Sequence, residues 1–388
     1  MEKTLTPLYS SSRPTPSCTL WCRVIDNFGD AGVAWRLAKS LSQSFHWRVR
    51  LLVDNVATLA AFVPECPKDA VSTVVSGVRI ERWTEESGRA EARRVPDVTI
   101  ETFSCRLPDE VEEGIAARFE ENRPTFVFAL DYLTAERYAE ESNGLISRHP
   151  RWGYPKTFLF PGFSSKTAGI VREEDVEALR LRFTQENRRS FLTTYGADPD
   201  APFTLFLFTY PVNPVADLAR ALAADPRPAQ VLLAPGEASR QFKTALGRLA
   251  APQVQTVDLP MLPQIDFDQV LMASDACLVR GEDSTVRVQL AGVPLLWTLY
   301  PQTEETHLVK FRAFGALYGA LLPEPARKSW FTLEEGLNAS GFAPEHWTAW
   351  RDALPQLREG AQKWRQTLLS QSSAPRTIAR IVQEKLQY

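Results

Sequence analysis

The 388-residue chain carries 44 Lys and Arg against 47 Asp and Glu, a formal net charge of -3, and 44% of its residues are hydrophobic. This length exceeds one ordinary core and predicts two domains of similar size, with the composition of a globular protein. The charge balance leaves no basic footprint, so nucleic acid is not expected as a partner. No apolar run reaches the roughly 20 residues of a membrane helix, so no membrane partner is expected either.

The start of the chain and its cysteines indicate the cellular location and the kinds of site to expect. Residues 1–17 are polar, rich in Ser, Thr and Pro, and lack a hydrophobic signal region, which predicts a disordered tail on a cytoplasmic protein. The five cysteines are scattered, and the histidines show no ligand spacing. We therefore expect no structural zinc site, no other metal and no disulfide framework.

In the first half, strand-like runs alternate with amphipathic stretches of helix length. Strands are predicted over Thr19–Ile25, Trp47–Val53, Val78–Trp83, Val98–Phe103, Thr125–Leu130 and Thr157–Phe160. Helices are predicted over Val33–Phe45, Val56–Phe62, Asp109–Glu121 and Ala135–Glu141. This alternation favours a parallel sheet with helices on both faces, although periodicity alone leaves a barrel open.

A charged stretch over 173–195 ends in a cluster of turn residues, Gly196–Pro202, which is typical of a boundary. The alternation then restarts. Strands are predicted over Phe203–Thr209, Gln230–Leu233, Val254–Asp258, Ala276–Val279 and Leu295–Thr298, and helices over Val215–Ala223, Glu237–Leu249, Asp266–Met272 and Ser284–Ala291. After Phe342 an amphipathic tail broken by Pro355 predicts helices that pack back across the domain junction. The expected fold class is α/β, with two doubly wound domains facing a central cleft.

The first candidate site follows the strand Thr19–Ile25, in a turn that holds two carboxylates, Asp26 and Asp30. Open α/β sheets place their chemistry at the carboxyl ends of strands. Two acids four residues apart in such a turn could supply a general base and the group that orients it. The alternative is structural: Asp30 caps the following helix and Asp26 forms an Asx turn.

The second candidate site follows the predicted strand Ala276–Val279. Arg280 and a glycine come next, and Asp283 or Ser284 is placed to cap the following helix. A helix amino terminus attracts phosphate oxygens, and an arginine fork suits a diphosphate. Glu282 could accept hydrogen bonds from sugar or ribose hydroxyls. The alternative is a well-capped helix with surface charges, and the usual G-x-G-x-x-G and Walker A fingerprints are absent.

Five separated motifs together indicate a family. They are Asp26-Asn-Phe-Gly-Asp-Ala-Gly-Val-Ala-Trp-Arg-Leu37, Phe160-Pro-Gly-Phe-Ser-Ser-Lys-Thr-Ala-Gly169, Leu262-Pro-Gln264, Arg280-Gly-Glu-Asp-Ser284, and Tyr300-Pro-Gln302 with His307-Leu-Val-Lys310. With them the chain resembles the bacterial elongation factor P arginine rhamnosyltransferases. The resemblance implies a glycosyltransferase of the GT-B type. It also implies an inverting, metal-independent transfer of L-rhamnose from dTDP-β-L-rhamnose to an arginine of elongation factor P, which activates that factor, with no cofactor.

The same resemblance implies roles for single residues. Asp30 matches the proposed general base, Asp26 its neighbour in the motif, and Glu282 the catalytic glutamate near the donor. The other implied substrate-binding residues are Asn27, Phe28, Gly29, Tyr210, Met261, Gln264, Arg280, Gly281, Asp283 and Ser284. Met261 stands where related sequences usually carry a phenylalanine that stacks on thymine. Ala168 stands where the first glycine of a Gly-Gly pair is common.

The expected organisation is a tail over 1–17, an acceptor-binding domain over 18–180, and a nucleotide-sugar-binding domain over 181–365. A final helix over 366–388 is expected to pack back on the first domain. Two other functions remain open from the residues: a sugar-nucleotide 2-epimerase that shares the GT-B architecture, and a non-catalytic sensor of nucleotide sugars. The epimerase would turn over its sugar nucleotide without a protein acceptor, and the sensor would bind it without turnover.

Overall fold

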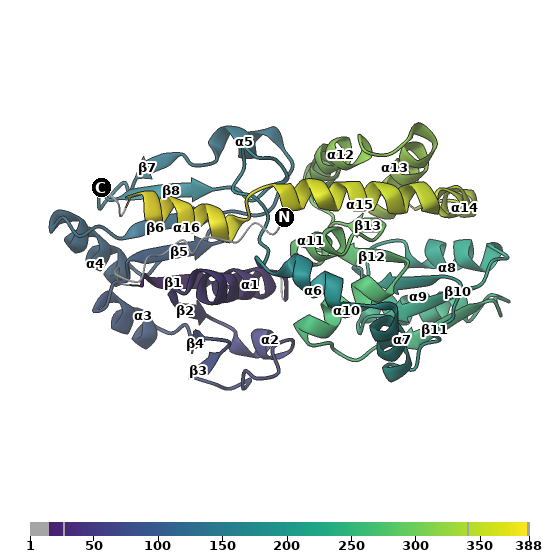
Figure 1. The fold of residues 1–388 in the computed structure, drawn as a ribbon, viewed down its shortest axis with the longest axis horizontal. Helices are drawn as coiled ribbons and strands as arrows, with labels where there is room; N and C mark the ends of the chain where they lie inside the picture. The colour runs from purple at the N-terminus through teal and green to yellow at the C-terminus, as the bar shows by residue number, and fades with distance from the viewer. Residues whose placement is uncertain (1–14, 26–27, 340, 386–388) are drawn as a thin grey trace. The chain divides into compact units, whose positions relative to one another are not determined.

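The computed structural model describes residues 15–25, 28–339 and 341–385. Most of the predicted tail, as well as Asp26 and Asn27, therefore lies outside the described residues. The chain divides into two compact units (Figure 1). The first unit comprises 1–133, 137–174 and 372–388, and the second comprises 134–136 and 175–371. Among the described residues, no helix has the length and apolarity needed to cross a bilayer.

An eight-stranded sheet forms the centre of the first unit, in the order β3-β4-β2-β1-β5-β6-β8-β7. The strands are β1 (Ser17–Cys22), β2 (Arg48–Val53), β3 (Ser72–Val75), β4 (Val78–Arg82), β5 (Val98–Thr102), β6 (Phe126–Leu130), β7 (Ile146–Arg148) and β8 (Pro155–Leu159). Six of them run parallel, and β3 and β7 pair antiparallel at the two edges. The chain builds outward from β1 to one edge and from β5 to the other. The switch point of this sheet therefore lies between β1 and β5.

Helices cover both faces of this sheet. Successive residues of β1 point to opposite faces and pack into two different apolar clusters. Leu20 and Cys22 pack into a cluster with α1 (Phe28–Phe45), α2 (Val56–Ala60) and the last helix, α16 (Ala374–Lys385). Trp21 packs on the opposite face with α4 (Asp109–Glu120). The remaining helices of this unit are α3 (Glu85–Ala92) and α5 (Arg137–Ser142).

The last helix belongs to the first unit although the chain reaches it from the second. Its buried residues Ile378 and Val382 share the apolar cluster of α1, and α16, yellow in Figure 1, contacts α1. The connection is fixed where the amide of Ala374 donates to the carbonyl of Ile170 at 2.9 Å. Residues at both ends of the sequence therefore build one core.

The second unit contains a five-stranded, wholly parallel sheet in the order β11-β10-β9-β12-β13. Its strands are β9 (Thr204–Leu207), β10 (Ala229–Leu233), β11 (Val254–Asp258), β12 (Ala276–Arg280) and β13 (Leu295–Thr298). The order reverses between β9 and β12, so this sheet also has a central switch point. The strands β9, β10, β12 and β13 are almost entirely buried, as expected for a parallel sheet covered on both faces, whereas the edge strand β11 is largely exposed or half-buried.

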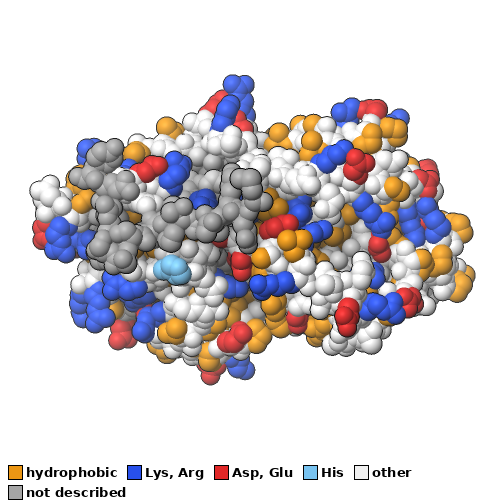
Figure 2. All heavy atoms as spheres, viewed as in Figure 1, with side chains coloured by type: hydrophobic (Ala, Val, Ile, Leu, Met, Phe, Trp, Pro, Cys, Tyr) orange, Lys and Arg blue, Asp and Glu red, His pale blue; other side chains and the backbone are white. Residues whose placement is uncertain are grey.

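The second unit is rich in helices. They are α6 (Val176–Arg182), α7 (Gln185–Thr194), α8 (Val215–Ala224), α9 (Glu237–Leu246), α10 (Gln264–Ala273), α11 (Glu282–Ala291), η1 (Thr303–Glu305), α12 (Thr306–Gly319), α13 (Glu324–Asn338), α14 (Pro344–Asp352) and α15 (Leu354–Ser370). The break predicted at Pro355 is confirmed, because this residue lies in the first turn of α15. On the face drawn in Figure 2, Lys and Arg side chains are interspersed with Asp and Glu.

Candidate functional site

The turn after β1 differs from its prediction at both ends. The strand ends at Cys22 instead of Ile25, and α1 begins at Phe28 instead of Val33, so both predicted limits are wrong. The segment Phe28–Gly32 contains two glycines, which is why it reads as a turn from sequence. It is helical here because Ala31 is buried in the apolar cluster of the first unit.

Asp30 consequently lies in the first turn of α1. Its side chain is only 2% exposed, and its Oδ2 accepts a hydrogen bond from the amide of Ile25 at 2.8 Å. The carboxylate therefore fixes the turn that follows β1 from within α1, and the alternative in which Asp30 caps this helix from outside is wrong. A carboxylate has about four lone-pair sites, so accepting this hydrogen bond is compatible with accepting a proton.

Asp30 lies close enough to Cys22, the last residue of β1, to affect the pKa of its thiol. Burial raises the pKa of the Cys22 thiol, and the nearby Asp30 carboxylate raises it further.

The other residues predicted for this site lie in the same turn or at the start of α1. The Phe28 ring lies edge-on to Phe62 at 6.3 Å and packs against the apolar cluster of the first unit, while Gly29 is helical. Asp26 and Asn27 lie outside the described residues.

The neighbouring strand contributes a feature that sequence reasoning missed. Phe103 and Ser104, directly after β5, have φ angles of 55° and 59°. Two consecutive left-handed residues other than glycine are costly and cluster at functional sites. The Phe103 ring stacks on Tyr132, with centroids 4.7 Å apart. Nothing in a Phe-Ser dipeptide signals this conformation, and it lies at the switch point of the first sheet.

In the second unit, the turn from β12 into α11 is built around Gly281, whose φ is 71°. Its carbonyl accepts hydrogen bonds from Thr285 Oγ1 at 2.7 Å and from Trp297 Nε1 at 3.1 Å. Gly281 is the N-cap residue, and α11 has no side-chain cap. The predicted capping by Asp283 or Ser284 is therefore wrong, because the helix starts two residues earlier, at Glu282, and takes both residues into its first turn.

Arg280 is held against two aromatic rings. Its guanidinium carbon lies 4.8 Å from the ring centre of Phe208 and 4.5 Å from that of Tyr210. The Tyr210 ring in turn meets Tyr300 edge-on at 5.4 Å. Stacking of this kind orients a planar guanidinium and leaves its edge for hydrogen bonds. Phe208 was not among the predicted site residues, because its neighbour Tyr210 alone belonged to a recognised position.

Glu282 forms an ion pair with Lys310 of α12, at 2.6 Å between Oε1 and Nζ. The two side chains are 18% and 23% exposed, so the pair is largely shielded yet reachable from solvent. Lys310 was quoted only as part of a family motif and was given no role. The structure brings it to the predicted catalytic glutamate.

The remaining predicted donor residues lie on nearby elements. Ser284 is 8% exposed in the first turn of α11, and Asp283 beside it is partly buried. Gln264 is the first residue of α10, and Met261, in the loop before it, is 46% exposed. Exposure of Met261 leaves an apolar side chain on the surface near the start of α10.

A buried hydrogen-bond network connects α13 to the turn between β12 and α11. Glu334 of α13 is fully buried, which raises the pKa of its carboxyl, and it accepts a hydrogen bond from the amide of Trp297 at 2.8 Å. Asn338, one turn later, donates to the carbonyl of Trp297 at 2.8 Å. Trp297 also donates to the carbonyl of Gly281. The helix α13 therefore holds β13 in place, and β13 holds the turn that leads into α11.

Comparison with known proteins shows which family the chain belongs to. The chain matches, over residues 18–383, the sequence model of the family described as Elongation-Factor P (EF-P) rhamnosyltransferase EarP. It is 34% identical over 386 residues to a protein-arginine rhamnosyltransferase of Neisseria meningitidis serogroup B, covering 94% of this chain and 96% of that protein. It is 36% identical over 364 residues to the Pseudomonas putida protein of the same name, covering 89% and 93%.

Solved structures show the same architecture. A structure on EarP-mediated arginine glycosylation of translation elongation factor EF-P aligns with a TM-score of 0.62 and 25% identity, covering 96% of this chain and 99% of that one. MurG of Acinetobacter baumannii aligns with a TM-score of 0.52 at 14% identity, covering 96% and 100%, which shows the fold alone. The predicted α/β fold, with two Rossmann-like sheets of the GT-B type, is confirmed.

Proposed function

The chain belongs to the elongation factor P rhamnosyltransferase family, and from that premise we propose that it transfers L-rhamnose from dTDP-β-L-rhamnose to an arginine of elongation factor P. The observation that carries this proposal is the family match, which extends over residues 18–383. Relatives more than 30% identical over most of both chains share one activity by name. We place the reaction in the cytoplasm, where a translation factor meets its modifying enzyme.

The second unit is the proposed donor site. Arg280, oriented by Phe208 and Tyr210, lies directly before the amino terminus of α11. A forked cation beside the positive amino-terminal end of a helix suits a diphosphate and stabilises the negative charge that develops as it departs. The ion pair with Lys310 holds Glu282 in place beside this group. We therefore assign a transfer that uses protein cations at the leaving group and no metal ion.

The first unit supplies the proposed acceptor chemistry. A guanidinium is a poor nucleophile because its nitrogens are delocalised and remain protonated at neutral pH. A carboxylate must orient it and accept a proton as the bond from nitrogen to the anomeric carbon forms. We assign this role to Asp30, with Asp26 helping to bind the guanidinium. The bond from that carbon to the diphosphate oxygen breaks on the opposite face, so the anomeric centre inverts.

The decisive experiment is mass spectrometry of purified elongation factor P after incubation with this protein and dTDP-β-L-rhamnose. We expect a mass gain of one deoxyhexose on a single arginine. Consumption of the sugar nucleotide without any protein acceptor would instead support a 2-epimerase. Binding of the sugar nucleotide without turnover, in the presence of the acceptor, would support a sensor.

A further inference from the structure

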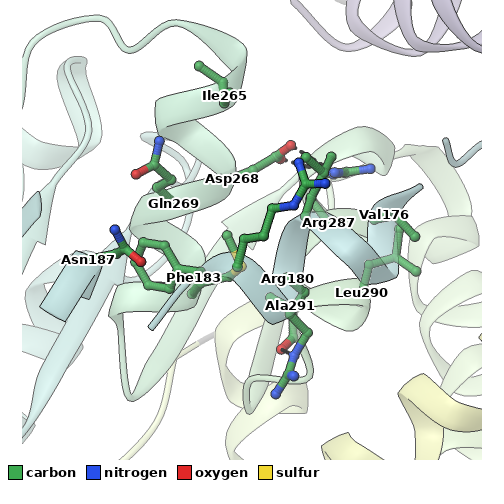
Figure 3. Close-up of a pocket in the computed structure, with 13 residues that line it drawn as sticks. Val176, Arg180, Phe183, Asn187, Ile265, Asp268, Gln269, Arg287, Leu290 and Ala291 are labelled. Atoms are coloured by element: carbon green, nitrogen blue, oxygen red, sulfur yellow. Dashed lines mark hydrogen bonds and ion pairs between the residues drawn. The ribbon is translucent and has the colours of Figure 1, made fainter. Parts of the chain in front are cut away.

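Two neighbouring hollows lie in the second unit and share Arg180, Phe183, Met272 and Ala291. The smaller, of about 200 Å³, is drawn in Figure 3. It combines apolar side chains with Asp268 and Arg287, which pair with each other at 2.7 Å. Figure 3 shows Arg180 beside Ala291 and away from Asp268. The charged end of Arg180 therefore points toward the larger hollow.

The larger hollow, which we call the arginine cavity, has a volume of about 360 Å³. It is lined by residues of α6, α7 and α15 and of the segments before β12 and β13. Three of its lining side chains are guanidinium groups, Arg180, Arg188 and Arg358, and one is a carboxylate, Asp275. The charged lining thus carries an excess of two positive charges.

The single carboxylate of the cavity is already engaged. One oxygen of Asp275 accepts from the amide of Thr204 at 2.8 Å, and the other accepts from Arg358. Arg188 approaches Asp275 only to 3.9 Å, which is an ion-pair distance beyond hydrogen-bond reach. Asp275 therefore neutralises one of the three arginines, chiefly Arg358.

The helix ends at the cavity are also satisfied. The helices α10 and α11 point their negative carboxyl ends here, and arginine side chains hydrogen-bond their last carbonyls. Arg188 Nε donates to Ala273 at 2.9 Å, and Arg180 Nε donates to Ala291 at 3.2 Å. Arg180 has no further hydrogen bond to any residue that the structure describes. Its two terminal nitrogens therefore retain their donors for a ligand.

From this arrangement we propose that the arginine cavity binds a small molecule that carries phosphoryl groups. Guanidinium forks match phosphate oxygens in geometry, and the volume falls in the range of small-molecule pockets, about 300–1,000 Å³. The cavity is separate from the donor site. Asp275 precedes β12 and Pro294 precedes β13, whereas Arg280 ends β12. The ten residues of α11 join the two sites over about 15 Å.

The test is calorimetric titration of the full-length protein with inorganic pyrophosphate at constant ionic strength. Arg280→Ala is the background, so that the donor site contributes little diphosphate binding. We expect saturable binding, weakened about tenfold or more by Arg180→Gln, because a charged hydrogen-bonding partner is lost. Arg182→Gln is the matched control: Arg182 lies exposed on the same helix and lines only the smaller hollow. It removes the same charge and should leave binding unchanged.

Thermal unfolding monitored by circular dichroism verifies that each variant remains folded. Absence of saturable pyrophosphate binding, or an equal effect of both substitutions, would overturn the proposal, since general electrostatics would then account for the data. Unchanged binding in Arg180→Gln would also overturn it. Tighter binding of polyglutamate than of pyrophosphate would show a surface for an acidic protein and reject a small-molecule site.

Discussion

Two carboxylates, Asp30 and Glu282, carry the proposed chemistry, and the protein holds them by different means. Asp30 is bonded to a backbone amide in the first turn of a helix, whereas Glu282 is bonded to the ammonium of Lys310. A neutral donor positions a carboxylate without quenching its charge. An ammonium both positions and compensates the charge, which suits a group beside a diphosphate. Substitutions that affect the two acids are therefore expected to change turnover for different reasons.

Asp30→Asn should remove most turnover and leave donor binding intact. Asparagine keeps an oxygen for the Ile25 amide but cannot accept the guanidinium proton, and loss of a general base costs about 10²–10⁴ in rate. Turnover is measured by mass spectrometry of the acceptor and donor affinity by calorimetry with dTDP. Asp54→Asn is the control, because exposed Asp54 accepts from the amide of Val24 in the same turn at 2.9 Å. Near-normal turnover by Asp30→Asn would reject its role.

Arg280→Ala should weaken dTDP binding, because a diphosphate loses a forked and oriented partner. A loss of about 1.5–3 kcal/mol is expected for a hydrogen bond to a charged group, or roughly tenfold to over a hundredfold in affinity. Arg280→Lys should recover only part of it, since an ammonium lacks the fork. Calorimetry that finds dTDP affinity unchanged in Arg280→Ala would place the donor elsewhere.

Lys310→Gln should lower turnover by about tenfold or more, because Glu282 loses its charged partner. Arg312→Gln is a matched control on the same helix. Arg312 pairs loosely with Glu335 at 3.7 Å, and its side chain is 61% exposed. The two variants are compared by steady-state rates at saturating donor. Equal rates in both would remove Lys310 from the site.

At the scale of elements, predictions of strand limits from sequence succeed where prolines bound the strand. The limits of β11 and β13 match the prediction because a proline lies within three residues of each end of both strands. The edge strand β7 was missed since its three residues are all exposed. The charged stretch over 173–195 is two helices, α6 and α7, separated at Thr184, whose capping box with Asn187 starts the second.

The candidate site was predictable to the same degree. Strand–turn–helix spacing located Asp30 and Arg280, since each lies within one continuous segment. Phe208 and Lys310 come from other segments, and only the fold brings them to Arg280 and Glu282. Spacing along the chain gives no information on such contacts, so they could not be predicted.

One element-scale contact has a direct test. Gly169 has a φ of 82°, and a β-carbon there would lie 2.0 Å from the carbonyl oxygen of Ser372, where the chain enters α16. Gly169→Ala should therefore displace that segment and destabilise the first unit by more than the roughly 1–2 kcal/mol of a left-handed alanine. Gly144→Ala is the control, because Gly144 has the same φ of 82° and open space around it. Thermal unfolding compares them, and equal melting temperatures would contradict the packing argument.

At the scale of the whole molecule, one plan is used twice. Each unit builds a parallel sheet outward from a central pair of strands, and each candidate group lies at the switch point of its own sheet. The acidic turn follows β1 and the Arg280 turn follows β12. On the proposed assignment the two substrates bind in different units, and we expect selectivity for the acceptor to be a property of the first unit.

That selectivity can be tested on the acceptor. If Asp30 and Asp26 read the planar fork of arginine, elongation factor P with lysine at the modified position should not be a substrate, although its charge is kept. A lysine ammonium is compact and cannot bridge two carboxylates in one plane. Free arginine should also react poorly, because binding energy from the folded acceptor is needed to position the guanidinium. Mass spectrometry of wild-type and lysine-substituted factor, treated identically, measures the difference. Efficient modification of the lysine variant or of free arginine would show that the first unit selects its acceptor by other means.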